Sequence, residues 1–268
     1  MPKANINNIE INYELDGKGD ETIVILNGIM MSTASWVDFV PVYTKNNYKF
    51  LRVDFRDQGL SSKYPEDYDV SIHVEDLKGL LEYLEIESAH IVGISYGAMV
   101  ATLFELKYSD MVKTLILSNT VGKVPEYLKA ASEVWEEASK LNDGRKFFKF
   151  SMPFIYSDHF YNHQKEWLDE REDQLAEALS KEWFEALIRL SKSSKDFDVW
   201  DQLSKIKSPT LLIGGSRDIL TPVEKMKKMQ KEIDNAKMLI INDAGHASCY
   251  EKTDEFNTAV LGFVAVNS

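Results

Sequence analysis

The stretch HIVGISYGAMVA covers residues 90–101 and places one serine between two glycines. β-Branched residues lead up to Gly93, which predicts a buried strand over 90–94, and the apolar spacing then becomes helical over 97–108. Gly93, Ser95 and Gly97 match the pattern G-x-S-x-G, in which a sharp strand-to-helix turn presents the serine above the sheet. Ser95 would then lie at a helix N-terminus, where partial positive charge favours a developing oxyanion. The stretch therefore predicts a presented nucleophile.

Further continuous apolar runs have the length and composition of strands that are buried on both faces of a parallel sheet. They cover 22–28, 48–55, 112–118, 209–215 and 237–243, and two shorter strands are expected within 4–15. Helical patterns are expected at 71–84, 221–231 and 254–266, with Pro222 at the first helical position of the second. This alternation predicts an α/β fold with a mostly parallel central sheet that is flanked by helices.

Residues 121–204 interrupt the alternation, because they show no strand pattern and hold nearly half of the chain's aromatic residues. Helical segments are expected at 125–141, 163–178 and 181–193. The favoured interpretation is a lid over the carboxyl edge of the sheet, and the alternative is an extra helical layer whose aromatic residues form its own core. We therefore expect a core domain of residues 1–120 and 205–268 and an inserted helical lid of residues 121–204.

A serine hydroxyl is a weak nucleophile at neutral pH and needs a base, which in turn needs an orienting acid. His246 follows the last expected strand in NDAGHASCY and is predicted to be the base. Of the other histidines, His73 and His90 are expected to be structural or solvated, and His159 and His163 lie in the expected lid.

The acid is expected at the end of another strand. Asp218 lies just past a buried strand in GGSRDILTP and is the favoured candidate, the alternative being a simple turn aspartate. Asp243 is a rival, but it precedes His246 by only three residues and is expected to brace that loop. Asn119, at the end of the strand over 112–118, offers no carboxylate.

Two backbone N–H groups are predicted to form an oxyanion hole, one from Tyr96, directly after the nucleophile, and one from Ile29 in LNGIM (26–30). Further residues of this turn and aromatic residues of the expected lid are predicted to contact the substrate: Asn27, Gly28, Met30, Trp135 and Phe154.

Composition limits the partners that the protein could have. The chain of 268 residues carries a net charge of −12 and a single cysteine, Cys249. Nucleic acid and anionic membrane surfaces are not expected as partners, because both require a basic patch. No metal or organic cofactor is expected either, since zinc-ligand spacings, a phosphate loop and a dinucleotide fingerprint are all missing from the sequence.

The sequence also shows no run near the roughly 18 apolar residues of a spanning helix and no secretory signal at its N-terminus, so a cytoplasmic location is expected. Oligomeric state stays open, with a homodimer as one option.

Taken together, these motifs resemble the α/β-hydrolase fold superfamily, and in particular its small cytosolic, lid-bearing bacterial esterase-like members. The resemblance covers essentially the whole chain and rests on LNGIM, DFRDQGLSS (54–62), GISYGA (93–98), GSRD (215–218) and GHASCYEKTDEFN (245–257). It implies Ser95 as nucleophile, Asp218 as acid and His246 as base, in the superfamily's own chain order.

Two positions depart from the pattern that these relatives usually show. Asn27-Gly28 stands where they have His-Gly, and Asn27 is expected to hydrogen-bond the loop in the same way. Asp57 stands where they have glycine, and its charged side chain is expected to alter its loop or to lie near the rim of the pocket.

Serine at position 95 excludes the dehalogenase and epoxide hydrolase branches, which use aspartate there. The leading hypothesis is hydrolysis of a carboxylic ester of a mainly apolar small molecule through an acyl-enzyme. A thioesterase is the second hypothesis, and a lactonase would use the same triad. A ligand-sensing signalling protein on the same fold is the alternative outside enzymes.

Overall fold

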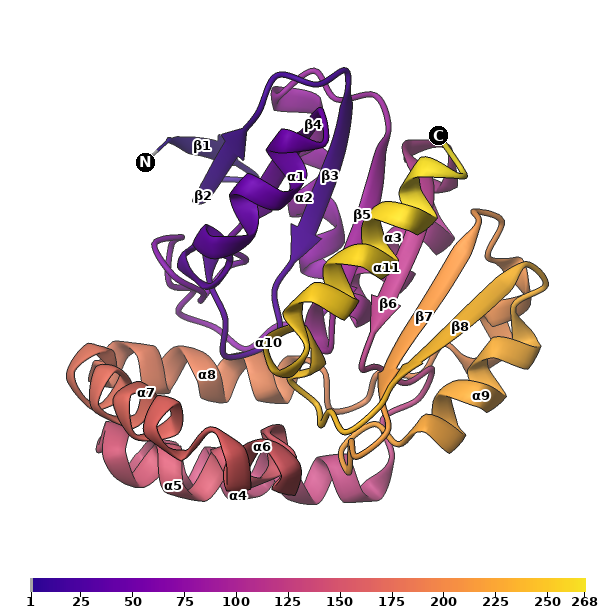
Figure 1. Ribbon diagram of the computed structural model, residues 1–268. Coiled ribbons are helices and arrows are strands. Elements are labelled where there is room, and N and C mark those ends of the chain that lie inside the picture. Colours follow the sequence, from indigo (N-terminus) through magenta and orange to yellow (C-terminus); the bar gives the residue numbers. More distant parts are fainter. Residues whose placement is uncertain (1) are drawn as a thin grey trace.

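The computed structural model describes residues 2–268, and eight strands form one sheet in the order β1-β2-β4-β3-β5-β6-β7-β8 (Figure 1). Their bounds are β1 (Lys3–Ile6), β2 (Ile9–Asp16), β3 (Glu21–Leu26), β4 (Tyr48–Val53), β5 (Ala89–Ile94), β6 (Val112–Ser118), β7 (Thr210–Gly215) and β8 (Ala236–Ile241). Strands β1 and β2 pair antiparallel, as do β2 and β4, whereas the neighbours from β4 to β8 are parallel. The predicted mostly parallel sheet is confirmed.

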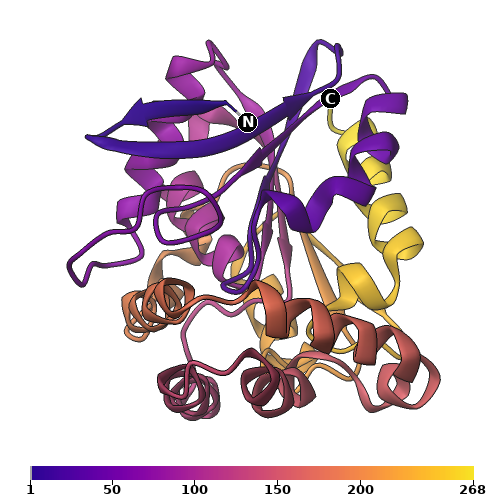
Figure 2. The ribbon, with the colours of Figure 1, turned by 90° about the vertical axis from the view of Figure 1, so that its left-hand side faces the viewer.

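Helices cover both faces of this sheet, which explains why its strands are continuous apolar runs. Along β3, Val24 and Leu26 face one buried cluster, and Ile23 and Ile25 face the other. The first cluster lies under α2 (Ile72–Tyr83), α3 (Tyr96–Tyr108) and α9 (Val223–Glu232). The second lies under α1 (Val40–Lys45) and α11 (Thr253–Ala265), which Figure 2 shows on the opposite side of the sheet.

Five helices are inserted between β6 and β7, and Figures 1 and 2 show them together across the carboxyl ends of the parallel strands. They are α4 (Glu126–Lys140), α5 (Gly144–Ile155), α6 (Asp158–His163), α7 (Lys165–Ala178) and α8 (Lys181–Ser193). Three were predicted to within about two residues, whereas α5 and α6 were missed. We call residues 121–204 the helical insertion.

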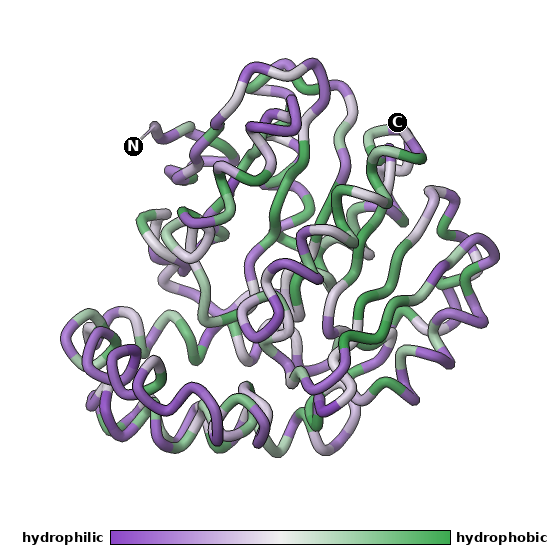
Figure 3. The backbone as a smooth tube through the Cα atoms, viewed as in Figure 1, coloured by the Kyte–Doolittle hydropathy of each residue, from purple (hydrophilic) through white to green (hydrophobic). Residues whose placement is uncertain are grey.

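Aromatic residues of the helical insertion pack partly against one another. The ring of Phe147 lies 5.4 Å from that of Trp183 and 5.6 Å from that of Phe184. These rings belong to the same buried cluster as Val24 and Leu26 of β3, so the insertion packs against the sheet domain as well as on itself. Figure 3 shows the contrast with the central strands β3, β5, β6 and β7, which are mainly apolar, while apolar and polar positions alternate along the inserted helices.

Several predicted strands end earlier than their apolar runs, at Leu26, Val53 and Ile241. The remaining residues of each run turn away from the sheet and build loops at its carboxyl edge.

The prediction that Pro222 is the first residue of a helix was wrong, because its ψ of 142° is extended and α9 begins at Val223. Within residues 2–268, no helix is both long and apolar enough to cross a membrane.

Candidate active site

Ser95 occupies a strained turn between β5 and α3, with φ at 52° and ψ at −111°. The two glycines of the motif allow this turn by removing side chains. A Cβ at Gly93 would lie 2.5 Å from Ala98 Cα, and one at Gly97 would lie 2.2 Å from the backbone oxygen of Leu26. The strand, the helix and the neighbouring loop therefore approach each other closely enough to present Ser95 above the sheet.

Three loops at the carboxyl edge bring Ser95, His246 and Asp218 into one chain of hydrogen bonds. His246 Nε2 lies 2.8 Å from Ser95 Oγ, and His246 Nδ1 lies 2.9 Å from Asp218 Oδ2. Asp218 and His246 are buried, and Ser95 is partly open to a cavity. The arrangement can take a proton from the serine hydroxyl and stabilise the resulting imidazolium.

The carboxylate of Asp218 is surrounded by donors. Its Oδ1 accepts the N–H groups of Leu220 and Thr221, and its Oδ2 accepts the Thr221 hydroxyl and the Asn119 amide. Burial opposes ionisation of this group, but the charge of His246 and these hydrogen bonds outweigh it, so the pKa of Asp218 lies well below its ordinary value. Asp218 is therefore an ionised partner for an imidazolium.

Asn119 is a residue whose part in the site the sequence analysis missed. Its Nδ2 donates to Asp218 Oδ2 at 2.8 Å and to the Gly245 carbonyl at 3.3 Å, and its Oδ1 accepts the Ser248 hydroxyl. It thereby joins the loop of Asp218 to the loop of His246. The only signal in the sequence was its place at the carboxyl end of a buried strand.

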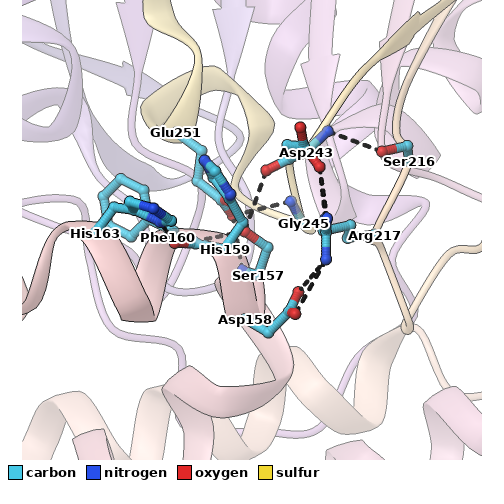
Figure 4. A network of polar contacts seen from close by, with 10 residues as sticks. All are labelled: Ser157, Asp158, His159, Phe160, His163, Ser216, Arg217, Asp243, Gly245 and Glu251. Carbon is cyan, nitrogen blue, oxygen red and sulfur yellow. Dashed lines mark hydrogen bonds and ion pairs between the residues drawn. The ribbon is translucent and has the colours of Figure 1, made fainter.

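Asp243, the rival acid, faces away from the imidazole and pairs instead with Arg217, at 2.6 Å. Its carboxylate is about half exposed, and no hydrogen bond joins it to His246 among residues 2–268. The Asp243 side chain thus braces the loop, as expected. His159 and His163 lie on α6 beside this loop (Figure 4). Neither residue lines a cavity that Ser95 also lines.

The predicted oxyanion donors are both free. Within the described chain, neither the Ile29 N–H nor the Tyr96 N–H is engaged in a hydrogen bond. Gly28 and Ile29 belong to a turn that is closed by a bond from Met31 N–H to the Gly28 carbonyl. Ile29 lines two spaces next to Ser95 and Tyr96 lines one of them, so the two amides are candidates to stabilise a tetrahedral oxyanion.

Asn27 does not contact the cavity, so the structure does not support its predicted contact with substrate. Its side chain is fully buried, donates to the Val53 carbonyl and to Gln58, and accepts the indole N–H of Trp36. Gln58 in turn donates to the Gly28 carbonyl at 3.0 Å. Asn27 therefore stabilises the loop that carries the Ile29 amide. Hydrogen bonding to this loop is what was expected of Asn27 from the sequence.

Ser95 opens onto a largely apolar cavity of about 820 Å³, including the part open to solvent. Of the residues predicted to contact substrate, Gly28, Met30 and Trp135 line this cavity. Phe154 does not, because α5 turns Met152 and Ile155 toward the cavity and packs Phe154 elsewhere. We call this space the apolar compartment. Its apolar walls come mainly from the Gly28 turn and the insertion: Ile29, Met31, Phe147, Tyr156, Leu175, Leu179 and Trp183.

A second space of about 520 Å³ is also lined by Ser95 and Trp135. Most of its walls belong to α4 and to the end of α8, and many of them are polar or charged. We call it the polar compartment, after Lys129, Ser132, Glu133, Glu136, Ser191, Ser194 and Lys195.

Asp57 lines neither compartment, so of its two expected effects, an altered loop or a place near the pocket rim, the structure does not support the second. Its φ of 67° is left-handed, which explains why glycine fits this position in other proteins, and its side chain is fully buried. The carboxylate accepts Arg189 Nη2 at 2.6 Å and the Tyr68 hydroxyl at 3.0 Å. Asp57 therefore ties the sheet domain to α8 of the insertion.

His73 and His90 are both buried and structural. His73 Nε2 lies 2.9 Å from the Tyr96 hydroxyl, which also contacts Ser193 Oγ at 2.7 Å. Burial, with a smaller effect of Arg56, lowers the pKa of His73 to about 3, so its imidazole is neutral at ordinary pH.

Cys249 lines the apolar compartment, and burial raises the pKa of its thiol to about 12. Across residues 2–268, no group of three or more acidic, histidine or cysteine side chains is placed to hold a metal ion.

The chain belongs to the alpha/beta hydrolase fold family, whose model matches residues 21–253. The crystal structure of MGS-M2, an alpha/beta hydrolase enzyme from a Medee basin deep-sea metagenome library, is 41% identical and superimposes with a TM-score of 0.95 over 98% of this chain and 97% of that one. The resemblance drawn from the sequence motifs is thus confirmed at the level of the family.

Curated relatives are more distant and differ among themselves in what they act on. The proline iminopeptidase of Lactobacillus helveticus is 26% identical, and the match covers 92% of this chain and 91% of the relative. The 2-hydroxy-6-oxononadienedioate/2-hydroxy-6-oxononatrienedioate hydrolase of Paraburkholderia xenovorans is 28% identical, with 96% and 91% covered. Family and relatives together identify the chain as a hydrolase, and its substrate has to be inferred from the site.

Proposed function

We propose that the protein is a serine hydrolase that cleaves a carboxylic ester of a mainly apolar small molecule through an acyl-enzyme. One observation carries the proposal: the hydrogen-bonded chain from Asp218 through His246 to Ser95 opens directly onto the apolar compartment. Residues 121–204 act as the lid of this site in the proposal, and residues 1–120 and 205–268 form the catalytic domain.

In the proposed mechanism, Ser95 Oγ attacks the ester carbonyl while His246 Nε2 accepts the hydroxyl proton. The N–H groups of Ile29 and Tyr96 stabilise the oxyanion, and one such donor is worth about 3 kcal/mol in related chemistry. His246 then gives its proton to the leaving alcohol, and an acyl group stays on Ser95. Water, deprotonated by His246, attacks this acyl group and releases the acid.

The preference for an apolar group follows from the walls of the apolar compartment. Its side chains are mostly aliphatic or aromatic, and their contact with a hydrocarbon chain supplies binding energy in proportion to the buried area. The same triad would serve a thioester or a lactone, and a ligand sensor would use the site without turnover. The substrate in each case is a small molecule, and neither nucleic acid nor a membrane is required.

The test is hydrolysis of p-nitrophenyl acetate, butyrate and octanoate by the wild type and by Ser95→Ala. We expect turnover of all three by the wild type, a preference for the longer chains, and no turnover by the variant above the solvent rate. A thioesterase would favour acyl-CoA over the oxygen esters, and a lactonase would favour a lactone. A folded wild type that releases a single burst of product and then stops would indicate a ligand sensor.

A further inference from the structure

The segment 155–158, which joins α5 to α6 within the helical insertion, touches the loops of both Asp218 and His246. Figure 4 shows this network around Ser157, Arg217, Asp243, Gly245 and Glu251. The insertion therefore does more than cover the site, because part of it contacts the backbone that positions the proposed acid and base.

The loop of His246 is held on both sides of the histidine. The N–H of Gly245 donates to Glu251 Oε1 at 3.0 Å, and the N–H of Ala247 donates to the Ile155 carbonyl at 3.1 Å. The loop also lies directly against the insertion, since a Cβ at Gly245 would be 2.7 Å from Ser157 N and 3.0 Å from the Ile155 oxygen. A shift of segment 155–158 would thus move the backbone that carries the imidazole.

Glu251 is the centre of this contact. It ends α10 (Ser248–Glu251), is half-buried, and accepts the Ser157 N–H and hydroxyl as well as the Gly245 N–H. Within the described chain, no lysine, arginine or histidine lies within 4 Å of its carboxylate. Burial raises the pKa of Glu251, and the three hydrogen bonds oppose that effect. Its carboxylate is therefore placed to bind backbone and hydroxyl donors from two separate segments.

A second contact joins the same segment to the loop of Asp218. Arg217, the neighbour of Asp218, donates to Asp158 at 2.9 and 3.0 Å and to Asp243 at 2.6 and 2.8 Å. This arginine is about two-fifths exposed, so solvent screens its ion pairs and weakens them. The half-buried contact at Glu251 is for that reason the stronger link between the insertion and the proposed triad.

We propose that Glu251 is a positioning residue that holds the loop of His246 against Ser157, so that docking of the insertion sets the distance between His246 and Ser95. The inference rests on the proposed function of Ser95 and His246. Removal of the carboxylate would free the Gly245 amide and let the imidazole move, and the Glu251 side chain itself lines neither of the two substrate compartments. The loss would therefore fall on kcat rather than on KM.

The experiment compares Glu251→Ala and Glu251→Gln with Glu255→Gln, a control in which an exposed glutamate of α11 is changed. Two measurements are made, each normalised to the concentration of active sites. The first gives kcat and KM for p-nitrophenyl butyrate. The second gives the rate of inactivation by the organophosphate paraoxon, which needs a basic His246 and a nucleophilic Ser95. We expect Glu251→Ala to lower kcat and the inactivation rate by roughly 10- to 100-fold with KM within threefold. Glu251→Gln should recover most of the loss, because its amide oxygen can accept the Gly245 N–H.

A kcat and an inactivation rate for Glu251→Ala equal to those of Glu255→Gln would overturn the inference, as would a raised KM at unchanged kcat. Ser157→Ala gives the same test if Glu251→Ala does not fold. It removes the hydroxyl bond to Glu251, together with the bond to the Asp243 carbonyl and the N-cap bond from the Phe160 N–H, and should lower kcat by a few-fold. An unchanged kcat in that variant would also contradict the inference. A wild type that reacts with paraoxon without hydrolysing any ester would refute the proposed function alone, and the inactivation rates would still test Glu251.

Discussion

The two compartments that meet at Ser95 differ in the side chains that form their walls. The apolar compartment is walled by aliphatic and aromatic side chains, whereas the polar compartment offers two lysines, two glutamates and several hydroxyls. Trp135, Ile29 and Ser95 line both compartments. An ester bound across Ser95 would place its two halves in unlike surroundings, so the difference predicts an asymmetric substrate with an apolar group on one side of the scissile bond.

The largest loss of turnover is expected from removal of Ser95 Oγ, the atom on which substrates in both compartments depend. Ser95→Ala should lower kcat by roughly 10⁴- to 10⁶-fold for every ester, whichever compartment its acyl group occupies. The measurement is steady-state hydrolysis of p-nitrophenyl butyrate and of a glyceryl ester. Substantial residual turnover of either substrate would show that the two compartments do not share Ser95 as the nucleophile.

A somewhat smaller loss is expected for Asp218→Asn, roughly 10³- to 10⁴-fold in kcat, because an amide does not hold the imidazolium as a carboxylate does. The depressed pKa of Asp218 means that its ionised form is favoured in the folded state. Its contribution to stability is therefore complete above the ordinary aspartate pKa and is lost as pH falls below it. The acid limb of the wild-type pH profile between pH 5 and 8 should accordingly not come from Asp218.

The apolar compartment is tested by filling it. Leu179→Trp adds bulk to its wall and should lower kcat/KM for p-nitrophenyl octanoate by about tenfold while leaving the acetate within twofold. The ratio of the two rates is the measurement. An equal loss for both esters would mean that the long chain does not occupy this compartment.

The smallest effect is expected in the polar compartment. Glu136 accepts the Ser191 hydroxyl at 2.7 Å and lines this compartment. Glu136→Gln should change kcat/KM for glyceryl butyrate by two- to fivefold and leave p-nitrophenyl butyrate unchanged. Glu137→Gln, a change of the neighbouring exposed glutamate outside the compartment, serves as the control. If the ratio of kcat/KM for glyceryl butyrate to kcat/KM for p-nitrophenyl butyrate is the same in Glu136→Gln and Glu137→Gln, the polar compartment does not take part in substrate binding.

The sheet and the three triad positions followed from simple patterns in the sequence. Continuous apolar runs identified β5, β7 and β8, of which β5 and β7 are buried and β8 is a partly exposed edge strand, and Ser95, Asp218 and His246 each follow one of them. Parallel strands bring such residues to a common edge, so their proximity required no knowledge of side-chain contacts.

The insertion and the supporting residues could not be predicted in the same way. Helix α5 has a regular buried stripe that includes Phe147, Phe148 and Met152, but it also contains Pro153, a residue that usually interrupts a helix, and the sequence analysis did not identify it. Asn27, Asp57 and Asn119 act through contacts with residues 26 to 132 positions away in the chain. Only the tertiary structure brings these partners together. The contacts by which Asp57 and Glu251 attach the insertion therefore cannot be read from the local periodicity of the sequence.

The central claim is that Ser95 carries the acyl group. The most direct measurement is intact-protein and peptide mass spectrometry after rapid acid quenching of the enzyme during turnover of p-nitrophenyl butyrate. The account predicts a mass increase of one butyryl group on the peptide that contains Ser95, which is absent in Ser95→Ala and persists longer in His246→Ala if that variant acylates at all. Butyrylation of Cys249 instead, or steady turnover by Ser95→Ala, would contradict it.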